Sequence, residues 1–420
     1  MDSRCGSVFR LLLEPDVALV CTSTGQVAAA IALGWRPTTA LTPCLLIIAV
    51  ASFVLGYRGW RVLEGSAKRV YTWIPLVLAS AGVALLCIEM LLFYVRGIQP
   101  LATALMASVA GVVLVGLTIW FDPRRYSEQA VWWIASGLLI LFGIAALEVL
   151  VRSLPKGIPL LAHPWLEAEV RRVPYEDPFR IIALISFLVG FSLRLTVYPR
   201  RFWIDVVLIV TACCAFLIIG FLTHVFAAVG LVLLDAFRRY GKQGWWRRQF
   251  ALFAVLLVGG ALALAVTGHL SRVLDRPRLT LTYLDMIVAR TSIWGEAKGA
   301  CMLWPPTSGV YIHTHLLAKY PEVFHYTNPR GISVVAGWPA APFIDFGVLG
   351  VVGVLMLLGF CAATANENVK NSTIAAFQEA CRNAAWLLAI LGCDSGVDWS
   401  VLYMFLTMAF VALQLRQRGE

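Results

Sequence analysis

The stretch from Trp203 to Phe237, WIDVVLIVTACCAFLIIGFLTHVFAAVGLVLLDAF, decides the fold class of this chain. It is almost entirely apolar, and basic pairs flank it, Arg200-Arg201 before it and Arg238-Arg239 after it. About 20 apolar residues in a helix cross the roughly 30 Å hydrocarbon core of a bilayer. Because short basic loops stay on the cytoplasmic side, the stretch should begin and end there and cross twice, turning outside near Gly220 to His224.

The composition of the whole chain agrees with this stretch. Of 420 residues, 60% are hydrophobic and only 14% are charged, and the mean hydropathy is +0.79. A soluble domain carries about 25% charged residues. Apolar runs of about 17–25 residues recur from end to end without the alternating pattern of an outer-membrane strand. The sequence therefore predicts an all-α, polytopic membrane protein and excludes a water-soluble one.

The basic loops give one consistent path through the membrane, with about twelve spans and both termini in the cytoplasm. Residues 1–267 form a transmembrane region of about nine spans, residues 268–341 a large periplasmic loop, and residues 342–420 the C-terminal transmembrane helices. The predicted spans are residues 16–34, 39–56, 71–95, 100–121, 130–151 and 180–197, two within 203–237, then 250–267 and 342–362, and two within 384–415.

The net charge of +10 does not indicate a nucleic-acid-binding protein. The basic residues are concentrated in the short loops, where they orient the membrane spans and do not form one basic face. The ten cysteines have no paired spacing, so neither a disulfide framework nor a zinc site is expected from them.

The polar segment from Asp275 to Asp345 contains several arginines, namely Arg276, Arg278, Arg290 and Arg330. A guanidinium matches two phosphate oxygens at once and stays charged at any working pH, so these arginines suit a pyrophosphate head group. A helical stretch is expected from Leu279 to Ala300, with Arg290 and Trp294 on one face. The alternative role for the arginines is to pair with Asp275, Asp285 and Glu296.

Histidines in the same loop, His315 and His325, are candidates for a general base. A neutral histidine can take a proton from a sugar hydroxyl near neutral pH, whereas simple polar roles in the loop are the alternative. A zinc site at His313 and His315 would need a third ligand at a recognisable spacing, so no metal and no cofactor are expected.

Three further polar residues, His224, Asp394 and Asp398, are expected at the tips of outer turns. There they would face the large loop and support a polar chamber at the outer leaflet. The alternative for each of them is an anchor at the membrane interface.

Two motifs in the loop point to a family. Residues 289–297 (ARTSIWGEA) contain Arg-x-x-x-Trp, and residues 305–310 (PPTSGV) contain a Pro-x-x-Gly turn. Residues 337–350 (GWPAAPFIDFGVLG) lead into the next span. These segments, with the predicted topology, resemble bacterial O-antigen polymerases and O-antigen ligases. The ligases carry a His-Asn pair before re-entry, where this chain has Trp338 to Ala341, and their hairpin arginine is His224 here. The resemblance therefore favours a polymerase-like member.

The resemblance implies a multi-pass enzyme of the bacterial cytoplasmic (inner) membrane that polymerises lipid-linked oligosaccharide repeat units at the outer leaflet. Its glycan donor would be a polyprenyl pyrophosphate carrier and its acceptor a hydroxyl, in contact with membrane lipid and with other polysaccharide-assembly proteins. Arg290 and Arg278 would contact the pyrophosphate, Arg276 and Arg330 would support them, and His325 or His315 would be the base.

Three other functions remain compatible with the sequence: an O-antigen ligase, a transporter or flippase of lipid-linked or anionic solutes, and a non-catalytic scaffold. Transporters usually place polar groups at mid-bilayer in broken helices. The charged residues Arg194, Asp205 and Asp235 instead fall near the expected cytoplasmic ends of their spans. This distribution favours chemistry in the outer loop over transport.

Overall fold

The computed structural model describes residues 11–63, 127–161, 170, 179–197, 202–220, 222–238, 244–298, 319–321, 323, 337–366, 372–395, 406, 408–409 and 411–412. Within these ranges every regular element is a helix and none is a strand, which confirms the all-α fold class. The chain divides into two compact units. Unit 1 comprises Met1–Ala18, Pro123–Asp275 and Lys370–Leu387, and unit 2 comprises Leu19–Asp122, Arg276–Val369 and Leu388–Glu420.

Unit 1 is built from the helices of the middle of the chain and most of one late helix. They are α7 (Glu128–Ser153), the 3-10 turn η2 (Leu154–Lys156), α9 (Phe179–Val197), α10 (Phe202–Ile219), α11 (Leu222–Arg238), α12 (Trp245–Val266), α13 (Leu270–Leu274) and most of α19 (Ser372–Ser395). Gly190 lets α9 lie directly against α7, because a Cβ there would be 3.1 Å from the Ala135 carbonyl oxygen. The core contains the rings of Phe142, Phe187 and Phe216.

Charged side chains inside unit 1 are paired between helices. The Arg194 Nε donates to the Asp205 carboxylate at 2.8 Å, with side chains only 11% and 3% exposed, and this pair joins α9 to α10. Arg238 of α11 pairs with Glu379 of α19 and donates to the Asn383 side chain. A charge with a partner is far less costly to bury than a lone one. These pairs let α19 begin at Ser372, earlier than the span predicted from residue 384.

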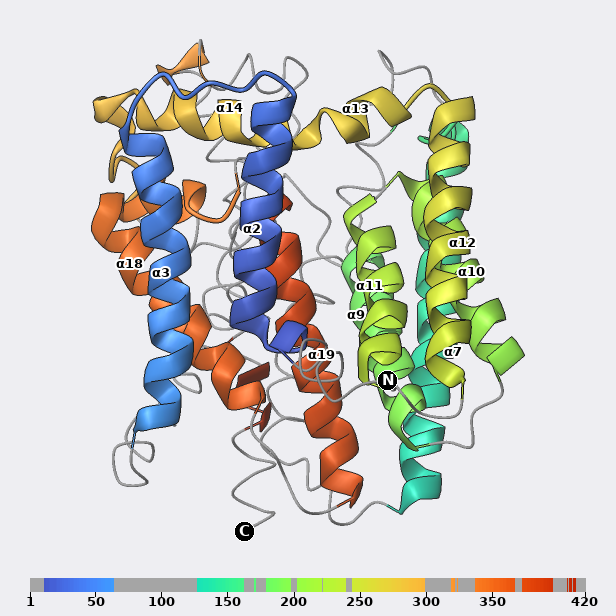
Figure 1. The fold of residues 1–420 in the computed structure, drawn as a ribbon. Coiled ribbons are helices and arrows are strands. Elements are labelled where there is room, and N and C mark those ends of the chain that lie inside the picture. Colours follow the sequence, from blue (N-terminus) through green and yellow to red (C-terminus); the bar gives the residue numbers. More distant parts are fainter. Residues whose placement is uncertain are drawn as a thin grey trace, which may run out of the picture. The chain divides into compact units, whose positions relative to one another are not determined.

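Unit 2 contains α3 (Leu41–Val62), α14 (Arg276–Val288), the 3-10 turn η3 (Thr291–Ile293) and α18 (Ala340–Ala365), with most of α2 (Pro15–Ala32) and the end of α19. α3 and α18 lie side by side, and α14 runs across the ends of α2 and α3 (Figure 1). Two glycines permit the close approach of α3 and α18. A Cβ at Gly56 would collide with the Met356 backbone, and a Cβ at Gly359 with that of Phe53.

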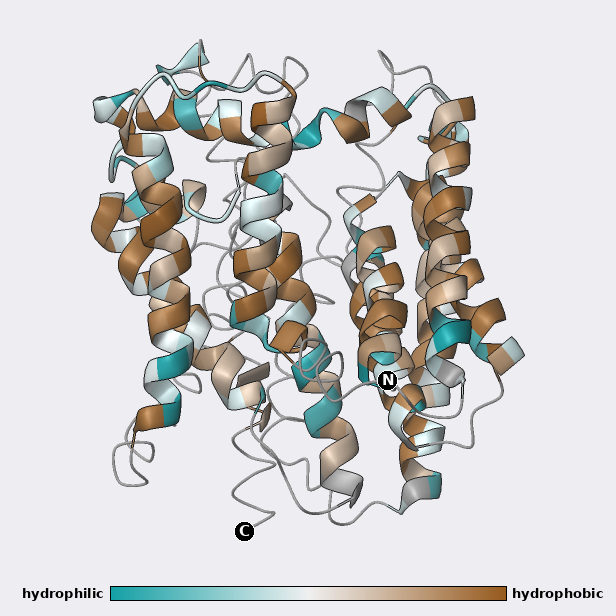
Figure 2. Ribbon diagram, in the orientation of Figure 1, coloured by the Kyte–Doolittle hydropathy of each residue, from teal (hydrophilic) through white to brown (hydrophobic). Residues whose placement is uncertain are grey.

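Five helices within the described residues are long and apolar enough to cross a membrane: Leu41–Val62, Gln129–Lys156, Phe202–Ile219, Trp246–Val266 and Ala340–Ala365. A shorter apolar helix covers Ile182–Thr196. Figure 2 shows that apolar residues cover most of α12. Large apolar side chains are left outside the packed core, for example Val266 at 87% and Leu349 at 82% exposure. Such helices indicate a membrane protein whose outer side chains contact lipid.

Most predicted spans coincide with helices. Those at residues 16–34, 39–56, 130–151, 180–197, 250–267 and 342–362 correspond to α2, α3, α7, α9, α12 and α18. The stretch at 203–237 forms two helices, α10 and α11, which separate at Gly220, where φ is +83°. Glycine adopts this backbone conformation without a steric penalty. The predicted spans at 71–95 and 100–121 lie outside the described residues.

The helix predicted from Leu279 to Ala300 is wrong in its second half. α14 ends at Val288, and Arg290 has an extended backbone with φ −102° and ψ 95°. The Trp294 indole turns back, and its Nε1 donates to the Val288 carbonyl at 3.1 Å. A local side-chain hydrogen bond thus satisfies a carbonyl that the ending helix leaves open. Arg290 and Trp294 therefore do not share a helical face.

The glycine contacts predict opposite results for two alanine substitutions in α3. Gly56→Ala should lower the stability of unit 2 by about 1–3 kcal/mol, because the new Cβ would overpack the contact with Met356. Gly59→Ala is the matched control: a Cβ there meets nothing within 4 Å, so alanine should leave the stability unchanged or raise it. Thermal unfolding midpoints of the purified protein in detergent measure both. Equal midpoints for the two variants would contradict the close packing of α3 and α18.

Candidate functional site

The Asp285 carboxylate anchors α14 to the connection between α2 and α3. Its Oδ2 accepts hydrogen bonds from the Thr38 backbone N–H at 2.8 Å and from the Thr38 hydroxyl at 2.6 Å. Its Oδ1 accepts one from the Thr42 hydroxyl at 2.5 Å. The side chain is buried, so these donors replace the water that an ionised carboxylate would otherwise require. The position of α14 across the end of α3 follows from this contact.

A pocket of about 280 Å³ opens beside this anchor in unit 2. Three segments line it: the α2–α3 connection, α14 with the residues that follow it, and the segment at residue 323. The lining residues are Trp35, Arg36, Thr38, Thr282, Asp285, Met286, Ala289, Arg290 and Val323.

Two arginines give the pocket its charge. Arg290 lies on the extended segment after α14, and Arg36 lies on the turn after α2, between the buried Trp35 and the ring of Pro37. Both side chains are exposed, whereas Asp285 is buried and already accepts three hydrogen bonds. Two arginines and one aspartate give the lining a net positive charge. Such a site favours an anionic ligand with several oxygens.

The chain after Arg290 is fixed to an interruption in α18. At Gly347 the backbone is not helical, with φ 67° and ψ −154°, so the carbonyls of Phe343 and Ile344 lose their helical partners. The Gly295 N–H donates to the Phe343 carbonyl at 3.2 Å, and the Ala297 N–H to the Ile344 carbonyl at 3.1 Å. These hydrogen bonds hold the wall of the pocket that carries Arg290.

A second support comes from residues 319–323. The Tyr320 hydroxyl donates to the Ser292 carbonyl at 2.9 Å, and Lys319 pairs with Glu296. The hydrogen bond to Glu296 raises the pKa of Lys319, so its ammonium group stays charged throughout the neutral range. Glu296 and Asp285, two of the carboxylates considered as partners of the loop arginines, thus contact Lys319 and the Thr38-containing turn.

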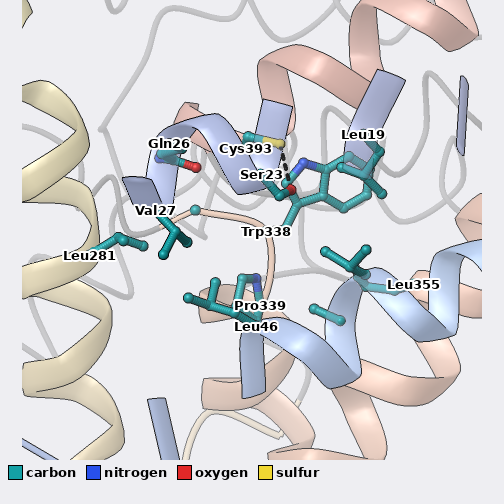
Figure 3. A pocket seen from close by; sticks show the side chains of 13 residues that line it. Leu19, Ser23, Gln26, Val27, Leu46, Leu281, Trp338, Pro339, Leu355 and Cys393 are labelled. Carbon is teal, nitrogen blue, oxygen red and sulfur yellow. Dashed lines mark hydrogen bonds between the residues drawn. The ribbon is translucent and has the colours of Figure 1, made fainter. Parts of the chain in front are cut away.

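A smaller cavity lies deeper in unit 2, where α2, α3, α18 and the end of α19 meet (Figure 3). Its volume is about 30 Å³, and most of its lining is apolar, including Leu46, Leu281 and Trp338. The Ser23 hydroxyl and the Cys393 thiol lie 3.3 Å apart in its wall. The cavity has room for about one water molecule and is too small for a head group or a lipid tail.

Trp338 stands where the ligases carry their His-Asn pair, and here it is a packing residue. It is buried, and its ring meets that of Phe53 edge-on with centroids 5.4 Å apart. It also lies against Gly392, where a Cβ would be 2.5 Å from the indole ring. This segment closes the core of unit 2 and supplies no ionisable group.

The structure places some of the predicted site residues and not others. Arg290 lines the pocket, whereas Arg276 and Arg278 lie in the first turn of α14 and do not line it. His224 belongs to unit 1, where it is buried in the first turn of α11 with its ring 5.3 Å from that of Phe216. Asp394 lies in the last turn of α19, and its side chain is outside the described part. His315, His325, Arg330 and Asp398 also lie outside the described residues.

Arg36 is the pocket residue that the sequence interpretation missed. It lies in a short turn, far in the sequence from the large loop, and contacts such as those of Thr38 with Asp285 and of Trp35 with Leu281 bring the two segments together. A signal was present, since Trp35 and Pro37 flank an arginine in a turn predicted to lie on the same side of the membrane as the loop. Among the described residues, no three histidine, cysteine or carboxylate side chains converge in a way that could hold a metal ion.

Comparison of the chain with protein-family models, with curated proteins and with solved structures finds no match.

The anchor at Asp285 gives a direct prediction for stability. Asp285→Asn replaces one accepting oxygen by an amide that cannot accept, which leaves Thr38 or Thr42 without its partner. The variant should lose about 1–3 kcal/mol of unfolding free energy. The control is Glu148→Gln, which removes the charge of a carboxylate that is 40% exposed in its pair with Arg152 and should change stability by less than about 1 kcal/mol. If the two variants unfold at the same temperature, the anchor does not hold α14 in place.

Proposed function

We propose that this protein is a glycosyltransferase of the cytoplasmic membrane that polymerises lipid-linked oligosaccharide repeat units at the outer leaflet. The donor is a glycan on a polyprenyl pyrophosphate carrier, and the acceptor is a hydroxyl of another glycan. The topology of about twelve spans, with a large periplasmic loop and cytoplasmic termini, is part of this proposal. The observation that carries it is the open, positively charged pocket formed by Arg290 and Arg36.

The chemistry of the pocket suits the leaving group of this reaction. ATP is not available outside the cytoplasm, so the sugar–pyrophosphate bond itself must provide the driving force. When that bond breaks, negative charge grows on the pyrophosphate, and guanidinium groups that are already in place stabilise it. Arg290 is held for this role by the hydrogen bonds that join Gly295 and Ala297 to α18.

The reaction needs a base as well as an anion site. The acceptor oxygen bonds to the anomeric carbon as the bond to the pyrophosphate breaks, and the acceptor proton passes to the base. His325 is the leading candidate, because it follows Val323 by two residues and Val323 lines the pocket. His315 is the other candidate, and Arg276, Arg278 and Arg330 supply further positive charge near the loop.

The two segments that form the pocket also agree with the proposed topology. The turn after the first span and the large loop are both assigned to the outer side by the positions of the basic loops. Hydrogen bonds between Asp285 of the loop and the Thr38-containing turn require that these segments lie at one end of the helices. An O-antigen ligase would use the same donor chemistry with a different acceptor and is the nearest alternative.

A transporter of lipid-linked or anionic solutes is a second candidate, and the interruption of α18 at Gly347 is the observation that favours it. Transporters often bind their cargo at the open backbone groups of broken helices. In α18, however, the carbonyls of Phe343 and Ile344 already accept hydrogen bonds from Gly295 and Ala297. The break serves to hold the loop, which favours the transferase.

Deletion of the gene should shorten the surface glycan to single repeat units while leaving those units displayed. Complementation with Arg290→Ala should restore less than about a hundredth of the wild-type polymer, because one lost contact to a developing anion costs about 100-fold or more in rate. Gel analysis of the glycan ladder measures the chain length, and immunoblotting confirms that the variant is present in the membrane.

Lys298→Asn is the matched control for Arg290→Ala. Lys298 is an exposed cation of the same segment, and its φ of 49° is one that asparagine tolerates. This variant should restore full polymer length. Normal ladders in the Arg290→Ala strain would remove the pocket from the reaction, and accumulation of the lipid-linked unit on the cytoplasmic side would identify a flippase instead.

A further inference from the structure

The pocket in unit 2 has two arginines from separate parts of the chain, Arg36 and Arg290, and the proposed function gives an individual role only to Arg290. We infer that the pocket is a two-point site for a diphosphate, in which Arg36 binds one phosphate group and Arg290 the other. This inference rests on the proposed function, and it adds Arg36, from the connection between α2 and α3, as a second residue that recognises the diphosphate.

Both arginines start from fixed backbone. Arg36 follows Trp35, which is 6% exposed and packs with Ala30 and Leu281. Two residues later, Thr38 is held to Asp285 through its backbone N–H and its hydroxyl. Arg290 is followed by the segment that is bonded to α18. A site whose cations are already placed loses less entropy when it binds.

The balance of charge in the pocket argues for more than one phosphate. The buried Asp285 carboxylate is part of the lining, and it reduces the attraction of the pocket for an anion. One arginine would only compensate that carboxylate, whereas the second leaves a net positive charge. Among the described residues Arg36 has no ion-pair partner, so its guanidinium is available to a ligand.

The size of the pocket limits what it can enclose. Its volume of about 280 Å³ lies just below the roughly 300–1,000 Å³ of pockets that enclose drug-sized molecules. A diphosphate with the sugar next to it fits this volume, whereas a full repeat unit or an isoprenoid tail does not. The pocket would then bind donors with glycans of any length equally well, as a polymerase requires.

The competing explanation is that Arg36 is an interfacial anchor that contacts lipid head groups in general. An anchor would respond to any anionic surface and would not distinguish a diphosphate from a single phosphate. A two-point site is expected to make that distinction, because pyrophosphate offers one phosphate group to each arginine whereas orthophosphate has only one.

The experiment measures binding to the purified full-length protein in a neutral detergent at low salt. The probes are inorganic pyrophosphate, orthophosphate and farnesyl pyrophosphate. The wild type should bind pyrophosphate at least about tenfold more tightly than orthophosphate, and Arg36→Ala should weaken pyrophosphate binding by about tenfold or more. Arg36→Lys keeps the charge but loses the paired donors of the guanidinium. Its affinity for pyrophosphate should lie between those of the wild type and Arg36→Ala. Lys156→Ala removes an exposed cation of η2 in unit 1 and should bind pyrophosphate as the wild type does.

The outcomes separate the inference from the proposed function. Unchanged pyrophosphate binding in Arg36→Ala, with a normal unfolding midpoint, would overturn the two-point site, and so would equal affinity for pyrophosphate and orthophosphate. If farnesyl pyrophosphate binds more tightly than pyrophosphate, the site takes a lipid-linked ligand. If the two bind equally, the site takes a diphosphate from any source. Either result supports the site. The proposed function fails independently if deletion of the gene leaves the glycan ladder unchanged.

Discussion

The buried carboxylate of Asp285 determines how unit 2 is assembled around its pocket. An ionised group removed from water requires donors, and Thr38 and Thr42 supply three of them at the start of α3. α14 cannot move away from the α2–α3 connection without leaving that charge unsatisfied. Because Arg36 lies two residues before Thr38 and Arg290 five residues after Asp285, the same contact brings two distant arginines to one pocket.

The packing of α3 against α18 supports the segments that line the pocket. α3 and α18 approach closely at Gly56 and Gly359, and this contact fixes the position of α3, which carries Thr42. In α18 the break at Gly347 releases two carbonyls, and the chain after Arg290 occupies them. Both walls of the pocket are therefore tied to the same pair of packed helices. Preorganised cations of this kind suit a reaction in which negative charge develops on a leaving group.

The sequence predicted the elements that depend on local pattern and missed those that depend on tertiary contacts. Lengths of apolar runs located α3, α7, α12 and α18, and a glycine between two such runs located the break between α10 and α11. The end of α14 could not be predicted, because it depends on an indole that returns to the Val288 carbonyl. The start of α19 at Ser372, before the predicted span, was also missed, since the pairing of Glu379 with Arg238 of α11 cannot be read from the sequence. Arg36 was missed although Trp35 and Pro37 flank it, because its approach to the distant loop depends on contacts such as that of Thr38 with Asp285.

The proposed diphosphate site requires that Arg36 and Arg290 both face the outside of the cell. Cysteines placed singly at positions 36 and 290, in a chain whose ten native cysteines have been replaced, report this directly through reaction with a membrane-impermeant maleimide on intact spheroplasts. Both positions should be labelled without permeabilisation of the membrane. Labelling of either position only after the membrane is opened would contradict the proposed site.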